Sequence, residues 1–405
     1  MTNKRKIIND PVFGFITIPS EFIFDLLQHP WLNRLSRIKQ LGLTHYVYPG
    51  TQHNRLQHSL GAMYLMTEAV KALQSKGVEI TDEEAEAVYA AILLHDIGHG
   101  PFSHALEGFF FENIPHEEVG LRVIERLNRE FGGRLSLTLD ILRGHCSKPY
   151  LHELVSGQLD MDRLDYLRRD SFFSGVSEGN IGSARIIKML NVKDDHLVVD
   201  AKGIYSIENF LMSRRLMYWQ VYLHKTTLAA DVMLRKTMLR ARLGAGESAA
   251  LCGSTALAGF IGAALTQVTD DALDAFLQLD DSDIWVALKA WRHSSDPILA
   301  LLADGIVNRR IFRVQVSGTP FPASLVEERM AGIETTLRVS REDREFLYAL
   351  QTRANHLYDD NDTGINILYS DGSTRNIAEA SDMFNINLLA HKNTKYYFCY
   401  YRLPE

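Results

Sequence analysis

The chain has 405 residues, 46% of them apolar and 23% charged, an ordinary globular composition with length for one large domain or two ordinary ones. The formal net charge of -7 argues against a protein built to coat nucleic acid. Cys146, Cys252 and Cys399 are too scattered for a zinc ribbon or a disulfide framework, which favours a reducing compartment. No signal peptide and no apolar run near the ~20 residues of a membrane span are present, so we expect a soluble, cytoplasmic protein.

The first part of the chain is predicted to be helical after a short hairpin. Residues 7–18 alternate β-branched and aromatic side chains around Asp10-Pro11 and Gly14, which predicts the hairpin. Thr81-Asp-Glu-Glu84 has the pattern of a capping box and predicts a helix start. Together with the spacing of apolar residues, these signals predict helices over 21–29, 31–41, 53–73, 82–96, from 116 onward, 135–142 and 151–173.

The later part mixes helices and strands. A hairpin-like stretch joins residues 197–199 to 203–205, and Ser206 is expected to cap a long helix over 207–242. A segment rich in Gly, Ala and Ser over 243–262 marks a soft domain boundary, followed by two helices within 270–303. Strands are predicted over 311–316, 365–369 and 396–401, with Asp371-Gly372 as a hairpin turn. We therefore expect a mostly α-helical protein, with a helical domain over 1–242 and a smaller α+β part over 243–405.

Histidines gather in the first part of the chain. Eleven of the fifteen lie between His45 and His224. The apolar stripe of the helix that starts at Thr81 continues by three or four residues to His95 and Asp96, so both fall on its buried face. An unpaired carboxylate there costs several kcal/mol, which predicts a cation as its partner. Gly98, Gly100 and Pro101 then end the helix.

A divalent metal site can be assembled from four side chains. His58, His95, Asp96 and Asp162 offer two imidazoles and two carboxylates, a set that suits Mn, Fe, Mg, Ni or Zn without selecting among them. Considered alone, His58 is more often a satisfied core histidine and Asp162 a member of a surface ion pair. The pair His95-Asp96 is the more informative part, because both residues fall on a buried face.

Several motifs in a fixed order give the chain a family resemblance. They are Asn-Arg-x-x-His at 54–58, His-Asp-x-Gly-His-Gly-Pro-x-x-His at 95–104 and Asp-x-Asp-Arg-x-Asp-Tyr at 160–166. With these motifs the sequence resembles the HD-domain phosphohydrolases, in the branch of the deoxynucleoside triphosphate triphosphohydrolases. The resemblance starts at Ile8, covers roughly the first 240 residues and continues more weakly to about Val316.

The resemblance implies a role for each matching residue. His58, His95, Asp96 and Asp162 match the family's metal ligands, and His116 and His104 match catalytic histidines that act as general acid and base. Other positions match groups that bind the substrate: Arg55, His99, Arg163 and Arg214 toward the phosphates, Gln40, Tyr166 and Asp170 at the sugar, and Tyr222 beside the sugar and base. Arg163 stands where the nearest relatives carry a lysine, so it would grip phosphate as a fork.

The implied activity is metal-dependent hydrolysis of deoxynucleoside triphosphates (dNTPs), dGTP among them, to a deoxynucleoside and tripolyphosphate. A nucleotide substrate, a nucleotide regulator and a homo-oligomer, dimer or tetramer, are the implied partners; binding of nucleic acid stays open. Two alternatives remain. One is another nucleotidase or phosphodiesterase of the same superfamily, and the other is a nucleotide-binding regulator with a vestigial metal site.

Overall fold

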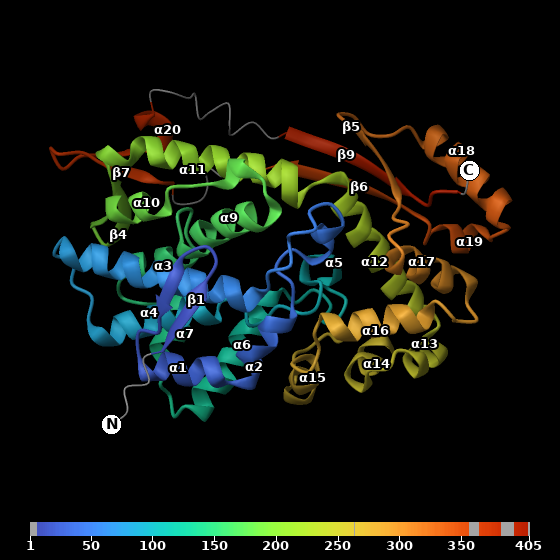
Figure 1. Ribbon diagram of the computed structural model, residues 1–405, viewed down its shortest axis with the longest axis horizontal. Helices are drawn as coiled ribbons and strands as arrows, with labels where there is room; N and C mark the ends of the chain where they lie inside the picture. The colour runs from blue at the N-terminus through green and yellow to red at the C-terminus, as the bar shows by residue number, and fades with distance from the viewer. Residues whose placement is uncertain (1–5, 263, 356–363, 382–392, 404–405) are drawn as a thin grey trace.

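The computed structural model describes residues 6–262, 264–355, 364–381 and 393–403. Helices dominate this part of the chain, as expected, and the sheets are small (Figure 1). Among the described residues, no helix combines the length and apolar character needed to cross a membrane.

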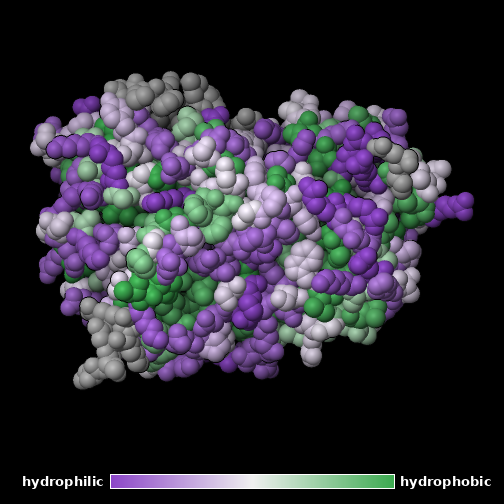
Figure 2. All heavy atoms as spheres, in the orientation of Figure 1, coloured by the Kyte–Doolittle hydropathy of each residue, from purple (hydrophilic) through white to green (hydrophobic). Residues whose placement is uncertain are grey.

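The chain begins with the predicted hairpin. Strands β1 (Ile7–Asp10) and β2 (Gly14–Thr17) pair antiparallel, and Ile16 on the inner face is fully buried. Helix α1 (Glu21–Gln28) starts at Ser20, whose side chain accepts a hydrogen bond from the Ile23 amide, as the sequence predicts. The outer face of the hairpin leaves Ile7 and Phe15 exposed, and Figure 2 shows a hydrophobic area over this corner of the molecule.

Helix α3 (Arg55–Ser75) is the centre of the first half. It packs against α4 (Asp82–Leu94) on one side and α9 (Met161–Ser174) on the other. The Thr81–Glu84 capping box that starts α4 is confirmed, because both reciprocal hydrogen bonds are present. The other helices of this half are α2 (Pro30–Asn33), α5 (Ser103–Leu106), α6 (His116–Glu130), α7 (Ser136–Leu142), α8 (Pro149–Ser156) and α10 (Ser183–Met189), with 3-10 turns at Arg34–Arg37, Gly42–Tyr46, Ser177–Gly179 and Ala201–Gly203.

Three predicted helices are wrong in extent. The helix expected over 31–41 ends at Asn33 and continues as a 3-10 turn. The helix expected over 151–173 is interrupted at Gly157, and Asp160 caps a new helix, α9. The helix expected over 207–242 starts earlier, as α11 (Ile204–Met217), passes through a π-helical turn (Tyr218–Tyr222), and resumes as α12 (Lys225–Leu243).

The predicted hairpin near residue 200 has a different partner strand. β3 (Leu190–Lys193) pairs with β4 (His196–Asp200), whereas residues 204 and 205 belong to α11. Strand β4 also pairs in parallel with β7 (Asn366–Leu368), which pairs with β8 (Thr374–Asn376) through the predicted turn at Asp371-Gly372. This four-stranded sheet joins the end of the chain to the helical first half.

The remaining elements lie beyond α12. Helices α13 (Ala245–Leu251), α14 (Thr255–Gly262), α15 (Asp270–Phe276), α16 (Asp281–Trp291) and α17 (Pro297–Val307) form a second helical group (Figure 1). The sequence predicted two helices within 270–303, but three are present, because Asp280 and Asp296 each cap a new one. Strands β5 (Arg313–Ser317), β9 (Asn393–Tyr400) and β6 (Tyr348–Asn355) form an antiparallel sheet in that order.

Several elements were not predicted from the sequence: strands β3, β6 and β8 and helices α5, α10, α13, α14, α18 (Ala323–Leu337), α19 (Arg341–Arg344) and α20 (Ile377–Ala380). Helix α12 contacts α17 extensively and also touches β5 and β9. The division at residue 243 remains a proposal, and only Gly244 separates α12 from α13.

Candidate active site

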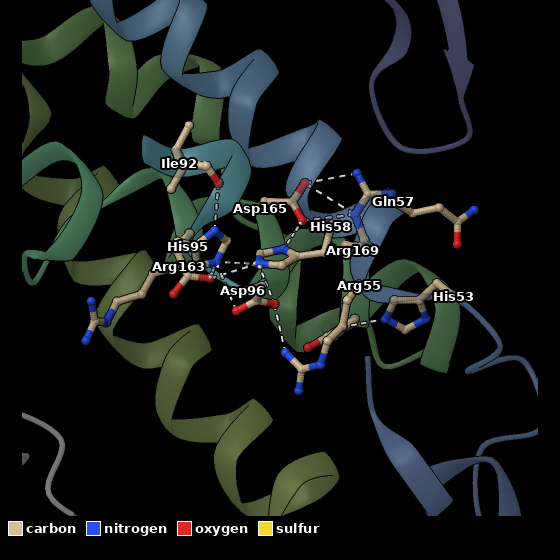
Figure 3. Close-up of polar contacts among 12 residues, drawn as sticks. His53, Arg55, Gln57, His58, Ile92, His95, Asp96, Arg163, Asp165 and Arg169 are labelled. Atoms are coloured by element: carbon tan, nitrogen blue, oxygen red, sulfur yellow. Dashed lines mark hydrogen bonds and ion pairs between the residues drawn. The ribbon is translucent and has the colours of Figure 1, made fainter. Parts of the chain in front are cut away.

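Three of the proposed metal ligands form a compact cluster where α3, α4 and α9 meet. The Nε2 atoms of His58 and His95 lie 3.2 Å apart, and Oδ1 of Asp162 is 3.0 Å from the first and 3.6 Å from the second. Asp96 completes the group, with Oδ1 3.2 Å from His95 Nε2 and Oδ2 3.9 Å from His58 Nε2. Residues separated by about a hundred positions in sequence therefore converge on one point (Figure 3).

The second nitrogen of each imidazole is already engaged, and this supports a metal in the cluster. His58 Nδ1 lies 2.7 Å from Asp165 Oδ2, and His95 Nδ1 lies 2.6 Å from the Ile92 carbonyl oxygen (Figure 3). Both acceptors require a proton on Nδ1, so the Nε2 lone pairs point into the cluster, as in metal-binding histidines. Two imidazole nitrogens and nearby carboxylate oxygens match the donor set of a divalent metal ion.

The electrostatics of the cluster favour positive charge at its centre. Burial disfavours a charged His58, yet hydrogen bonds with Asp162 and Asp165 raise its pKa to about 10. Burial alone would raise the pKa of the Asp96 carboxyl, but His95, His99 and Arg55 together hold it well below its usual range. Asp96 therefore stays ionised, and Arg55 Nη1 donates to its Oδ2 at 2.7 Å.

Beside the cluster lies a row of three histidines. The ring of His99 stacks on that of His116 with 3.8 Å between centroids, and His104 lies edge-on to His99 at 5.8 Å. Burial, with Arg55 and His116 nearby, lowers the pKa of His104 to about 4, so this imidazole is neutral at neutral pH. Burial and Arg55 likewise hold the pKa of His99 well below its usual value.

His116 opens α6, as predicted, and has a carboxylate partner that the sequence analysis did not single out. Its Nδ1 lies 2.9 Å from Glu107 Oε1. The hydrogen bond with His116 is the main reason that the pKa of Glu107 is lowered. This contact fixes the orientation of the imidazole at the rim of the site, the arrangement expected of a proton-transferring histidine with an orienting acid.

Asp170, one of the residues expected at the sugar, is the centre of a hydrogen-bonded group in the same site. Asp170 Oδ1 is 2.7 Å from His53 Nε2, and Tyr222 donates to Asp170 Oδ2 at 2.8 Å. The ring of Tyr166 stands edge-on to that of Tyr222, with 6.0 Å between centroids. Gln40 adds a buried side-chain oxygen with no hydrogen-bond partner among the described residues. This part of the site therefore offers polar atoms on aromatic walls, as small-molecule sites commonly do.

Arg163 and Arg214, both predicted to bind phosphate, differ in their position relative to the cavity. Arg163 Nη1 donates to Asp160 Oδ2 and to the Gly157 carbonyl oxygen, which holds the side chain at the start of α9. Arg214 hydrogen-bonds Gln158 through Nη1 at 3.0 Å and does not line the cavity that the other residues share. The structure thus brings Arg163, but not Arg214, to the common cavity.

A large cavity of about 1290 Å³ connects these groups. Its wall includes most residues singled out from the sequence: Gln40, Arg55, His95, Asp96, His99, His104, His116, Asp162, Arg163, Tyr166, Asp170 and Tyr222. His58 lies just behind this wall and is 1% exposed. The cavity extends along α12 to β6, where Asp231, Arg235 and Tyr348 line it. Its volume exceeds the few hundred Å³ that many small-molecule sites occupy.

The loop after α4 is anchored by residues from distant parts of the chain. The buried guanidinium of Arg34 donates to the carbonyl oxygens of Leu279, Ile97 and His99 at 2.9, 3.2 and 2.8 Å. Asp281, at the start of α16, accepts from the backbone amides of Lys39 and Phe102 at 2.9 and 3.1 Å. The second helical group therefore holds two segments of the cavity wall.

Five functional candidates escaped sequence analysis: Glu107, Asp165, Asp160, Arg34 and Asp281. Asp160 and Asp165 flank Asp162 within one motif, so their spacing could have flagged them. Glu107 lies three residues after His104 and carries no motif of its own. Arg34 contacts the loop after α4 across more than 60 residues of sequence, and Asp281 contacts Lys39 and Phe102 across more than 170, relations that only the folded chain reveals.

The arrangement described above is that of an HD-type metal-dependent hydrolase, with a His…His-Asp…Asp cluster inside a helical core. Comparison with family models agrees: residues 55–170 match the HD domain, and residues 181–250 match the HD associated region. The chain belongs to the HD-domain phosphohydrolase family, in the group that includes dNTP triphosphohydrolases, and is a hydrolase of that superfamily.

Individual relatives support this assignment. A crystal structure of a phosphohydrolase from Bacteroides thetaiotaomicron is 54% identical, with a TM-score of 0.95 over 98% of this chain and 100% of that one. An uncharacterized protein of Bacillus subtilis is 33% identical over 77% of this chain and 72% of its own length. The deoxynucleoside triphosphate triphosphohydrolase SAMHD1 of Mus musculus is 28% identical over 73% of this chain, and the match spans 51% of that relative's length.

Proposed function

We propose that this protein hydrolyses deoxynucleoside triphosphates to a deoxynucleoside and tripolyphosphate. The observation that supports this most directly is the common cavity. It brings His95 and Asp162 of the metal cluster together with the cations Arg55 and Arg163 and with the Asp170–Tyr222 pair. A nucleotide has matching parts: phosphates for a metal ion and the cations, and a sugar and base for the polar and aromatic groups. The named dNTP triphosphohydrolases among the relatives favour the same substrate class.

The roles of the residues follow from their positions. His58, His95, Asp96 and Asp162 would hold a divalent metal ion, which lowers the pKa of bound water and neutralises phosphoryl charge. Arg55 and His99 lie next to Asp96 and would bind phosphate oxygens, while Arg163 adds a fixed guanidinium. Tyr166 and Tyr222 would flank the sugar, and Gln40 and Asp170 would hydrogen-bond it.

Two histidines are available for proton transfer. His104 is neutral at neutral pH, as a proton acceptor must be, although the burial that lowers its pKa to about 4 also makes it a weak base. His116, held by Glu107, can donate one to the departing oxygen and be restored from solvent at the cavity rim. With one neutral and one carboxylate-paired imidazole, the site can both activate water and protonate the leaving group. A nucleotide regulator and assembly into dimers or tetramers are part of the proposal, by analogy with the family.

The test is a product assay. Purified protein with Mn²⁺ or Mg²⁺ is incubated with dGTP and, separately, with the other dNTPs, with and without added nucleotides as activators. Phosphorus NMR and chromatography should detect tripolyphosphate and the deoxynucleoside in equal amounts. Release of inorganic phosphate or of a nucleoside monophosphate instead would assign the protein to another class of nucleotidase or phosphodiesterase. No turnover of any dNTP, under every activator condition, would overturn the proposal.

A further inference from the structure

A second cavity lies on the outside of the helical core, away from the proposed active site. It has a volume of about 420 Å³ and opens between α3, α10 and the turn of the N-terminal hairpin. In Figure 1 these three segments meet on the left of the molecule, and in Figure 2 the surface there is mostly hydrophilic. This volume falls within the range of cavities that bind small molecules. None of the residues proposed for catalysis or substrate binding lines it.

The wall of this cavity carries an excess of positive charge. Its cationic side chains are Lys71, Lys76, Arg168 and Lys188, against the single carboxylate of Glu68. Lys71 pairs with Glu68 at 2.8 Å, and Lys76 pairs with Asp200 at 2.7 Å. Arg168 and Lys188 have no carboxylate within ion-pair distance in the described part of the chain. Two cations therefore remain available to an anion.

Arg168 is held in place by neutral groups. Its guanidinium donates to Ser183 Oγ and to the Val12 carbonyl oxygen, each at 3.3 Å, and lies 4.9 Å from the centre of the Phe13 ring. A guanidinium oriented in this way keeps its full charge and the donors needed for a phosphate group. The ring of Tyr64 lies 5.5 Å from that of Phe13, so an aromatic wall stands beside the cation.

The turn that forms this wall is fixed to the protein interior. Asp10 Oδ1 accepts from the amides of Val12 and Phe13, each at 2.9 Å, while its Oδ2 accepts from Arg169 Nη1 at 2.8 Å. Arg169 is fully buried and also pairs with Asp165 (Figure 3). The cavity is therefore formed before any ligand arrives, which lowers the entropic cost of binding.

From these features we propose that the cavity binds a small phosphorylated molecule. The phosphate group lies against Arg168 and Lys188, and the organic part packs on Phe13 and Tyr64. The combination of phosphate-binding cations with an aromatic wall suits a nucleoside phosphate better than a bare anion. This site goes beyond the proposed hydrolysis and does not depend on it.

Binding can be measured directly by titration calorimetry on the metal-loaded protein. The probes are inorganic phosphate and dGMP in separate titrations, against the wild-type chain and the variant Lys188→Gln. Lys188 is exposed on α10, so its replacement leaves the fold intact. Loss of one charge-assisted contact should weaken one binding event by about tenfold for both probes. The control is Lys289→Gln, an exposed lysine of α16 far from this cavity, which should bind as the wild type does.

Two further variants refine the assignment. Arg168→Gln should weaken the same binding event, and Phe13→Ala should weaken binding of dGMP while leaving that of phosphate unchanged. Unchanged affinity of Lys188→Gln and Arg168→Gln for both probes would overturn the proposal. Equal dGMP binding by wild type and Phe13→Ala would overturn the assignment of the organic part to the aromatic wall.

Discussion

The Nε2 atoms of His58 and His95 face each other at 3.2 Å, while the Nδ1 atom of each ring is held by its own acceptor. Two imidazole lone pairs at this distance repel unless a proton or a metal ion lies between them and the carboxylates. The arrangement is therefore best explained as a site that the fold prepares for a cation.

The first prediction concerns Asp165, which holds His58 from behind. Asp165→Asn removes the charge that accepts the His58 Nδ1 hydrogen and also leaves Arg169 with a weaker partner. We expect Mn²⁺ affinity to fall by about 10- to 100-fold, the usual effect of removing such a supporting carboxylate. Titration of the metal-free wild type and variant with Mn²⁺ measures this change in affinity. Asp140→Asn, an exposed position on α7, serves as the control, and equal affinity in both variants would contradict the prediction.

The second prediction concerns Glu107, which orients His116. Glu107→Gln keeps the size of the side chain but removes the charge that faces the imidazole. Because general acid-base groups contribute about 10²- to 10⁴-fold, we expect kcat to fall at least tenfold with little change in KM. Steady-state kinetics with dGTP, or with whichever nucleotide is turned over, supply the measurement. Glu118→Gln, exposed on α6 two residues after His116, should keep wild-type kinetics; a matching loss there would argue against a specific role for Glu107.

A third prediction follows from the burial of Asp281. Burial raises its pKa to about 6, although backbone amides of Lys39 and Phe102 oppose the shift. The folded state therefore holds a proton that the unfolded state has released, so the contribution of this group to stability falls as pH rises from about 4 to about 6. Across this pH range the contribution of Asp281 to the free energy of unfolding should fall by on the order of 3 kcal/mol.

Urea unfolding between pH 4 and 7 tests this contribution. In wild type, titration of Asp281 should lower the free energy of unfolding as pH rises, and this contribution should be absent in Asp281→Asn. The exposed control Asp270→Asn should show the same dependence of unfolding free energy on pH as wild type. Parallel slopes for wild type and Asp281→Asn would show that Asp281 does not titrate in this range.

The fourth prediction concerns the close approach of the loop after α4 to α6. A Cβ atom on Gly98 would lie 2.1 Å from the His116 carbonyl oxygen and 2.4 Å from the Gly120 nitrogen. Gly98→Ala must push α6 away, so we expect a loss of about 1–3 kcal/mol in unfolding free energy together with lower activity. Thermal unfolding provides the measurement. At Gly246, within α13, an added Cβ meets nothing within 4 Å, and Gly246→Ala should be neutral or slightly stabilising.

Local signals in the sequence predicted a good part of the fold. The cap at Ser20, the capping box at Thr81 and the start of α6 at His116 depend on neighbouring residues, and all three are present. The break at Gly157 was missed because apolar spacing on both sides of it looked continuous, although Asp160 is a strong capping residue. The π-helical turn at 218–222 has no comparable local signal. A π turn accommodates one extra residue within a helix, and no particular residue type marks its position.

The site divides in the same way. Motif spacing led to His58, His95, Asp96 and Asp162, and the structure places their side chains together. Motif spacing gave no sign of Arg34 or Asp281, because their partners are backbone groups of residues far away in sequence. Backbone acceptors and donors have no residue identity, so contacts of this kind leave no pattern for a reader of the sequence to detect.

The three carbonyl contacts of Arg34 also bear on how this chain can be recombined with its relatives. Its guanidinium is completely buried and links Leu279 to Ile97 and His99. In a chimaera whose crossover point falls between residues 100 and 278, these contacts join segments of two different parents. Such hybrids should fold only where both parents present the same backbone path at residue 279, so libraries built from blocks should keep Arg34, the loop after α4 and the start of α16 from one parent.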